Sequence, residues 1–77
     1  MSLQTLNLGS NKISELNPNL SKNQLLTELL LNSNQIEQIS ITISFPILKT
    51  LKLNVNHLSS FKLGFCPLLE NLNLNDN

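Results

Sequence analysis

Residues 48–58 read LKTLKLNVNHL, a run in which leucines recur at short intervals before a corner rich in asparagine. Leu48, Leu51 and Leu53 can share one buried side, because successive side chains of a strand point to opposite faces. The residues on either side of Leu51 then face outward. Asn56 falls where the chain turns sharply and backbone groups lose their partners along the strand. An amide side chain carries both a donor and an acceptor, so it can satisfy such groups.

The same eleven positions recur along the chain. They are found again at residues 3–13 and 26–36, and a fourth copy begins at Leu69 and reaches its ninth position at Asn77. Three full copies and one partial copy in register cover nearly the whole chain. The pattern L-x-x-L-x-L-x-x-N-x-L is typical of leucine-rich repeats, and the chain resembles a protein of that family. One domain, residues 1–77, is expected, with repeats at about 3–25, 26–47, 48–68 and 69–77.

The resemblance implies an α/β-type solenoid, a right-handed coil with a short parallel sheet on its concave side. The convex segments are expected to be mostly extended or 3₁₀. Repeats of 21–23 residues are similar to the class found in regulatory subunits of protein phosphatase 1, with its N-x-I-x-x-I/L continuation. The residues that match this continuation are Asn11, Ile13 and Leu16, then Asn34, Ile36 and Ile39, then Asn56, Leu58 and Phe61.

The segments that connect the repeats carry their own signals. Residues 39–45, ISITISF, alternate apolar and polar and are rich in β-branched side chains, which favours an extended segment over a helix. Pro18 biases the residue before it away from helix, so the first connection is expected to be rich in turns. Pro46 and Pro67 each lie two residues before a repeat and are expected to set the path into the next strand.

The ninth position of every repeat is an asparagine, and these residues are expected to form a structural ladder inside the turns. Each amide would satisfy backbone groups in its own coil and in the neighbouring one. The alternative is that they are ordinary turn residues, since asparagine favours turns in any chain. Asn54, by contrast, is expected to be exposed. The ladder residues are Asn11, Asn34, Asn56 and Asn77.

Composition limits the classes of partner. Five basic and five acidic residues give a formal charge of zero, so no electrostatic footprint points to nucleic acid or to an anionic membrane. The single cysteine cannot form an intrachain disulfide and fits a reducing compartment. The sequence has neither the basic start and apolar run of a signal peptide nor an apolar run of roughly twenty residues. A cytoplasmic protein is expected, with no nucleic-acid or membrane partner.

Residues that could carry chemistry are sparse. His57 is the only histidine and Cys66 the only cysteine, so a metal site would lack a second soft ligand. Cys66 lies in an apolar context and is expected to behave as a small buried hydrophobic residue. Gly9 and Gly64 are too far apart to form a phosphate-binding loop. We therefore expect no enzymatic activity, no metal and no cofactor.

The variable strand positions are expected to face the concave side, where leucine-rich repeat proteins commonly bind protein partners. Leu30 favours such a role, because it is apolar where a polar residue is expected. The alternative is a solvated sheet face without a partner. The candidate protein-binding residues are Thr5, Asn7, Glu28, Leu30, Asn32, Thr50, Lys52, Asn54, Asn71 and Asn73, with Gly9 and Asn75 at equivalent positions.

Three functional interpretations follow. The first is a protein–protein interaction module that binds an unidentified protein through the concave face. The second is a recognition or regulatory arm of a larger enzyme or enzyme complex, such as a kinase, ubiquitin ligase or phosphatase. The third is a bare fragment of a longer repeat array with no independent function. A fragment is expected because no cap covers the leucines of the first and last repeats. The chain is then also expected to self-associate through those uncapped ends, near Leu6 and Leu72.

Overall fold

The computed structural model describes residues 4–15, 25–39, 44–61 and 64–77. The predicted turn segment around Pro18 and residues 40–43 of the predicted extended segment lie outside these ranges. The molecule is compact, with principal extents of 30 × 22 × 22 Å.

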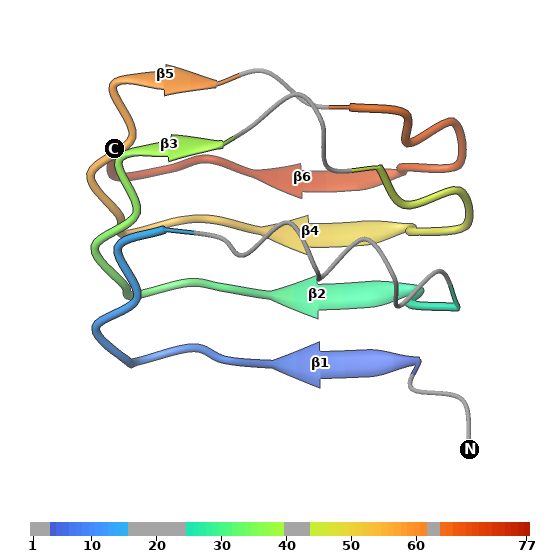
Figure 1. The fold of residues 1–77 in the computed structure, drawn as a ribbon, viewed down its shortest axis with the longest axis horizontal. Helices are drawn as coiled ribbons and strands as arrows, with labels where there is room; N and C mark the ends of the chain where they lie inside the picture. The colour runs from blue at the N-terminus through green and yellow to red at the C-terminus, as the bar shows by residue number, and fades with distance from the viewer. Residues whose placement is uncertain (1–3, 16–24, 40–43, 62–63) are drawn as a thin grey trace.

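Short strands form two parallel sheets (Figure 1). The larger sheet has four strands whose spatial order follows the chain, so each strand pairs with the strand of the next repeat. The smaller sheet has two strands. The described residues contain no helix, and the helical part of the predicted α/β class is therefore not found there. The four-stranded sheet comprises β1 (Thr5–Asn7), β2 (Glu28–Leu30), β4 (Thr50–Lys52) and β6 (Asn71–Asn73), and the two-stranded sheet β3 (Gln38–Ile39) and β5 (Ser60–Phe61).

Equivalent positions of the repeats pair directly across the larger sheet. The central leucines of the strands are aligned in one row, Leu6 with Leu29, Leu29 with Leu51, and Leu51 with Leu72. The side-chain period of a strand is two, so this register places all four on the same face. The parallel sheet predicted from the leucine spacing is confirmed.

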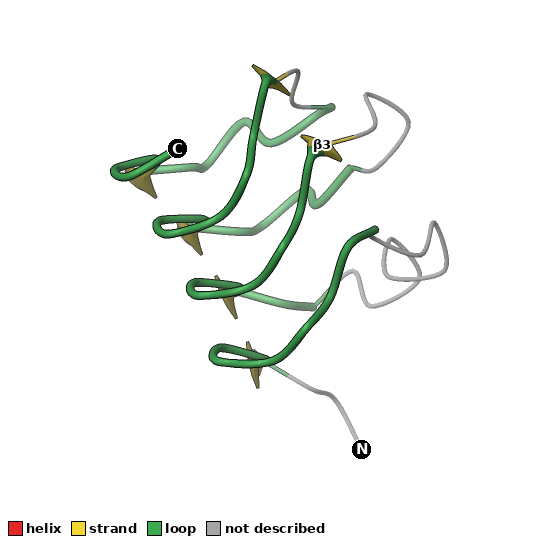
Figure 2. Cartoon of the chain, turned by 90° about the vertical axis from the view of Figure 1, so that its left-hand side faces the viewer, coloured by secondary structure: helices red, strands yellow, loops and turns green. Residues whose placement is uncertain are grey.

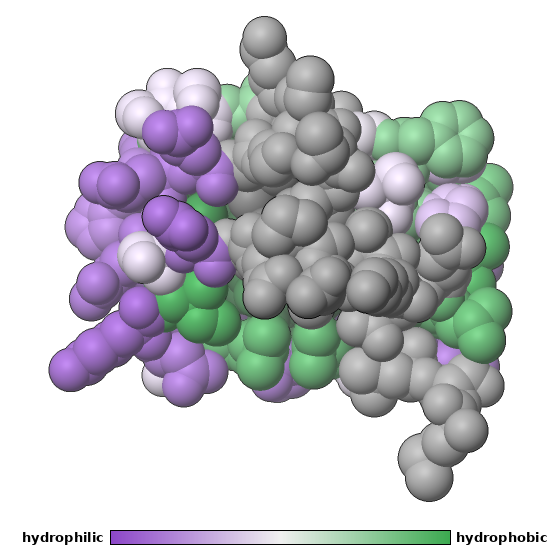
Figure 3. Space-filling model, viewed as in Figure 1, coloured by the Kyte–Doolittle hydropathy of each residue, from purple (hydrophilic) through white to green (hydrophobic). Residues whose placement is uncertain are grey.

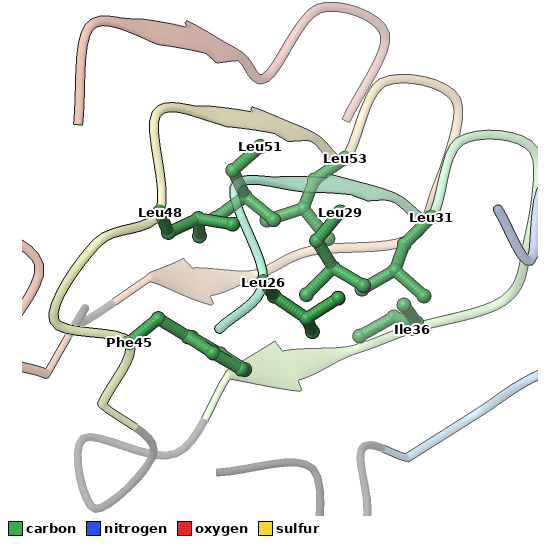
Figure 4. Close-up of a cluster of buried hydrophobic side chains, with 8 residues drawn as sticks. All are labelled: Leu26, Leu29, Leu31, Ile36, Phe45, Leu48, Leu51 and Leu53. Atoms are coloured by element: carbon green, nitrogen blue, oxygen red, sulfur yellow. The ribbon is translucent and has the colours of Figure 1, made fainter. Parts of the chain in front are cut away.

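The hydrophobic core lies between the two sheets. Seen along the strands (Figure 2), the chain leaves β1, β2 and β4, turns a corner after each of them and runs towards the side of β3 and β5. Eight apolar residues fill the space between, all at most 3% exposed. Burying a leucine side chain contributes roughly 1.5–3 kcal/mol, so this cluster is the main source of stability. Its members are Leu26, Leu29, Leu31, Ile36, Phe45, Leu48, Leu51 and Leu53 (Figure 4).

Proline turns lead into the third and fourth strands of the larger sheet. The Leu48 N–H donates to the Phe45 carbonyl at 3.4 Å, and the Leu69 N–H donates to the Cys66 carbonyl at 3.3 Å. Each bond closes a four-residue turn whose second residue is proline, where its fixed φ is favourable. The expected role of Pro46 and Pro67 is confirmed.

After each strand of the larger sheet the chain turns a corner, and one residue of this corner has a left-handed backbone conformation. The residue before each ladder asparagine has a φ of 58–60°. Serine and aspartate tolerate this conformation moderately well, whereas a β-branched residue is rare there. Val55 is therefore strained, although its side chain is 46% exposed. The four residues are Ser10, Ser33, Val55 and Asp76.

Candidate functional site

The outward-pointing side of the larger sheet carries the predicted binding residues. Because Leu29 and Leu51 point into the core, the residues flanking them in the strands face the other way. The register aligns one row of Thr5, Glu28, Thr50 and Asn71 and a second row of Asn7, Leu30, Lys52 and Asn73. We call these eight residues, together with Asn32 and Asn54 just beyond the strands, the outer sheet face.

The members of the outer sheet face differ in exposure. Four are exposed, namely Thr5, Asn7, Lys52 and Asn71; the other six are half-buried. Leu30 is among the half-buried residues, between Asn7 and Lys52 in its row. The face therefore combines one partly covered apolar residue with polar neighbours. Figure 3 shows the opposite side of the molecule, where hydrophilic side chains gather at the end that carries the corners.

Two asparagines of this face are held by their own backbone. The Gly9 N–H donates to Asn7 Oδ1 at 3.0 Å, and the Asn75 N–H donates to Asn73 Oδ1 at 3.0 Å. Such local bonds fix the amide and leave its NH₂ group for other acceptors. A Cβ at Gly9 would lie 3.0 Å from Asn32 Oδ1 and 3.2 Å from Asn7 Oδ1, so these two side chains would have to move by a few tenths of an ångström to admit it.

Asn54 corrects a prediction. It was expected to be exposed, but it is half-buried, and its Oδ1 is fully covered with no hydrogen-bond partner among the described residues. The cause is the close approach of the neighbouring corners. The Ser33 N–H donates to the Asn54 carbonyl, and the Val55 N–H donates to the Asn75 carbonyl, both at 2.9 Å. The corner that contains Asn54 is therefore held between the corners of the previous and the next repeat. An unpaired buried acceptor costs roughly 1–3 kcal/mol.

The ladder asparagines of the two internal repeats are buried and fully engaged. Asn56 Nδ2 donates to the Leu53 carbonyl of its own repeat at 2.9 Å and to the Leu31 carbonyl of the previous repeat at 3.0 Å. Its Oδ1 accepts from the Ile36 N–H at 3.0 Å. One repeat earlier, Asn34 makes the equivalent contacts with Leu31 and Leu8, both at 3.0 Å, and with Ile13 at 3.1 Å.

The outer two asparagines are exposed, and they differ from each other. Asn77 still reaches the previous repeat, since its Nδ2 donates to the Leu53 carbonyl at 3.0 Å and its Oδ1 accepts from the Leu58 N–H at 3.0 Å. Among the described residues, Asn11 donates only within its own repeat, to the carbonyls of Leu8 at 2.9 Å and Gly9 at 3.2 Å.

A hollow of about 560 Å³ lies over β4 and β6. It contains one cationic and one anionic side chain, Lys52 and Glu70, among neutral amides. Glu70 was not among the predicted site residues. It occupies the second pattern position, just before β6, and only the side-by-side placement of β4 and β6 makes it line the same hollow as Lys52. The hollow is lined by Thr50, Leu51, Lys52, Glu70, Asn71, Leu72, Asn73 and Asn75.

The residues considered for chemistry lie apart from this face. His57 is exposed at a corner, and Cys66 is a free, half-buried thiol packed against the core. Within the described ranges, no three His, Cys, Asp or Glu residues cluster closely enough to hold a metal ion. Nor does that part of the chain include a helix that could cross a membrane. Comparisons with protein-family models, curated proteins and solved structures gave no match.

Proposed function

We propose that this chain is a leucine-rich repeat solenoid that binds a protein partner through the outer sheet face, which is the concave side of such a coil. The repeated register supports the solenoid. All three strand junctions of the larger sheet align the same pattern positions. Asn34, Asn56 and Asn77 each bond to the preceding repeat in the same way. In a coil of this kind each repeat contacts only its neighbours.

The contrast between the two sides of the sheet is the observation that carries the binding function. Leu29 and Leu51 are 1% and 3% exposed on the inner side. On the outer side of the same strands, Lys52 is exposed and Leu30 is only half-buried. A rigid sheet with one side packed presents the other side with little conformational entropy left to lose on binding.

A further feature of the outer sheet face suits a polypeptide ligand. The hollow over β4 and β6 offers Lys52 and Glu70 together with amide groups. Amides can both donate to and accept from a peptide backbone. Leu30 supplies an apolar anchor one strand away, in register with Lys52.

The solenoid is tested by lengthening the chain. A second copy of residues 26–47 inserted after Ile47 would add one repeat and one more junction. Because stability is approximately the sum of repeats and junctions, we expect the melting temperature to rise while the circular-dichroism spectrum keeps its shape. A compact fold that is not a coil would have no place for the insert and would melt lower.

The binding face is tested by charge and truncation variants. A partner captured with the 77-residue chain as bait would be titrated against Leu30→Ala, Lys52→Glu and the corner control Lys12→Glu. Truncating a buried anchor costs about 2 kcal/mol or more, so we expect Leu30→Ala to weaken binding about thirtyfold. Lys12 lies at a corner and is exposed, so its variant is expected to bind normally. Loss of binding in Lys12→Glu alone would exclude the outer sheet face.

A further inference from the structure

Leu30 and Lys52 lie side by side at the centre of the outer sheet face. They occupy the same position in β2 and β4 and pair directly across the two strands. Each of these strands has a neighbour on both sides, since the strand order is β1-β2-β4-β6. Leu30 is half-buried and Lys52 is exposed. The middle of the face therefore offers an apolar contact directly next to a cationic one.

The distance between these two strands restricts the conformation of a ligand. Neighbouring strands lie about 4.8 Å apart, so a ligand that contacts both residues has to present two side chains on one face at a similar spacing. Side chains on one face of an extended chain recur about every 6.7 Å. In a polyproline II helix they recur about every 9.3 Å, which would skip the adjacent strand. An α-helix presents one about every 5.4 Å, and this is the closest match.

The charges around Leu30 favour a carboxylate on one side only. Glu28 lies in the same strand as Leu30, at the other end of β2, so both side chains point to the same face, and Glu28 is half-buried. An acidic group placed beside Leu30 along this strand would be repelled by Glu28. The other neighbour of Leu30 across the strands is Asn7, which is neutral. A ligand with an apolar group on Leu30 therefore gains from an acidic group on the β4 side, at Lys52.

We propose that the partner binds the outer sheet face with an amphipathic α-helix that crosses the strands. One apolar side chain of this helix packs on Leu30, and a carboxylate one turn away, at i±3 or i±4, pairs with Lys52. The inference deepens the proposed function and rests on it, because both use the same face. The amides that line the hollow over β4 and β6 can bind the backbone groups that a helix leaves unpaired at its end.

Selection from two peptide libraries tests the conformation and the spacing. Both contain peptides of about 18 residues, or about five helical turns; the first is held helical by a side-chain crosslink, and the second is unconstrained. The immobilised 77-residue chain is the bait. We expect the helical library to enrich peptides with an apolar residue and an aspartate or glutamate separated by i,i+3 or i,i+4. Enrichment of apolar and acidic residues at i,i+2, or of peptides without an acidic residue, would overturn the proposal.

A charge exchange tests the contact with Lys52. An enriched peptide, and its variant with lysine in place of the acidic residue, are titrated against the unaltered chain and against Lys52→Glu. We expect the acidic peptide to bind Lys52→Glu about fivefold more weakly than the unaltered chain, because this is the upper range for an exposed ion pair. The lysine peptide is expected to show the opposite preference. The control Lys12→Glu changes an exposed corner residue and is expected to leave both affinities unchanged. Equal losses for both peptides on Lys52→Glu would contradict the proposal.

Proline substitutions in an uncrosslinked form of the same peptide test the helix. Proline in the middle of a helix removes a backbone hydrogen bond and clashes with the preceding turn, so we expect it to weaken binding at least about tenfold. Proline at the first helical position is tolerated and serves as the control. Both substitutions are placed on the side of the peptide that faces away from the sheet. Equal binding of the two proline peptides would exclude a helical partner segment.

Variants of Leu30 separate a failure of this inference from a failure of the proposed function. We expect Leu30→Ala to weaken binding of an enriched peptide about thirtyfold, as for a protein partner. Leu30→Asn introduces the residue type found at the same position of β1 and β6, and is a second variant that this strand position already accommodates. If neither variant weakens any enriched peptide, both proposals fail. If they weaken binding but the peptide tolerates the central proline and the loss of its acidic residue, the face binds polypeptides and only the helical partner is excluded.

Discussion

The two internal repeats and the two outer repeats share leucine and asparagine at the same pattern positions, yet these residues differ in burial. Leu29 and Leu51 are 1% and 3% exposed, whereas Leu72 is 42% exposed. The internal asparagines, Asn34 and Asn56, are 6% and 7% exposed, and their outer equivalents are open to solvent. A leucine or asparagine in this fold therefore stabilises it more where a repeat packs on both of its sides than where a repeat packs on one side.

Leucine truncation is expected to give the largest contrast between the regions. Leu51→Ala removes a fully packed side chain and is expected to lower the free energy of unfolding by about 2–5 kcal/mol. Leu72→Ala affects a side chain that is 42% exposed and is expected to cost less than about 1 kcal/mol. Urea denaturation followed by circular dichroism measures both. Similar midpoint shifts for the two variants would mean that burial does not separate the internal and outer repeats.

The asparagines are expected to give the next largest contrast. Asn56→Ala removes one of the two amide donors from each of the Leu31 and Leu53 carbonyls. It also leaves the buried Ile36 N–H without its acceptor, at a cost of roughly 1–3 kcal/mol. Asn11→Ala removes only exposed contacts within one repeat, and its expected cost is within about 0.5 kcal/mol. The same denaturation experiment, repeated for the pair, decides between a ladder and a set of ordinary turn residues. The latter would give equal, small losses.

A smaller effect is expected at the corners, where the internal and outer repeats have the same backbone conformation. The corner backbone is left-handed in all four repeats, so its strain depends on the local residue type. Val55→Asn replaces a β-branched residue at a φ of 58° with one that tolerates this region. We expect it to stabilise the fold by about 1 kcal/mol. Ser33→Asn, at a φ of 59°, is the matched control and is expected to change stability by less than half as much. A lower melting temperature for Val55→Asn would show that the valine side chain has a packing role.

The parallel sheet could be predicted from sequence because the spacing of Leu48, Leu51 and Leu53 repeats along the chain and fixes both the strand and its inner face. The turns at Pro46 and Pro67 were predictable for a similar reason, since proline constrains its own φ. In both cases the information is local to one repeat.

The covered oxygen of Asn54 and the place of Glu70 in the hollow over β4 and β6 were not predicted. Both depend on how closely adjacent repeats approach, which no single copy of the pattern encodes. The binding residues themselves remain a prediction: the register brings them onto one face, but whether a partner uses that face awaits measurement.

The left-handed corners have a consequence for insertions and deletions. The repeats shorten from 23 to 22 to 21 residues along the chain, while φ at the four corners stays within 58–60° and the strands keep their register. The differences in length are therefore absorbed between one corner and the next strand. A residue gained or lost there leaves the alignment of the sheet unchanged. One gained between Leu51 and Leu53 would put the two leucines on opposite faces, since the side-chain period of a strand is two. Changes in length are thus confined to the return segments, and the strand-and-corner unit can change only by substitution.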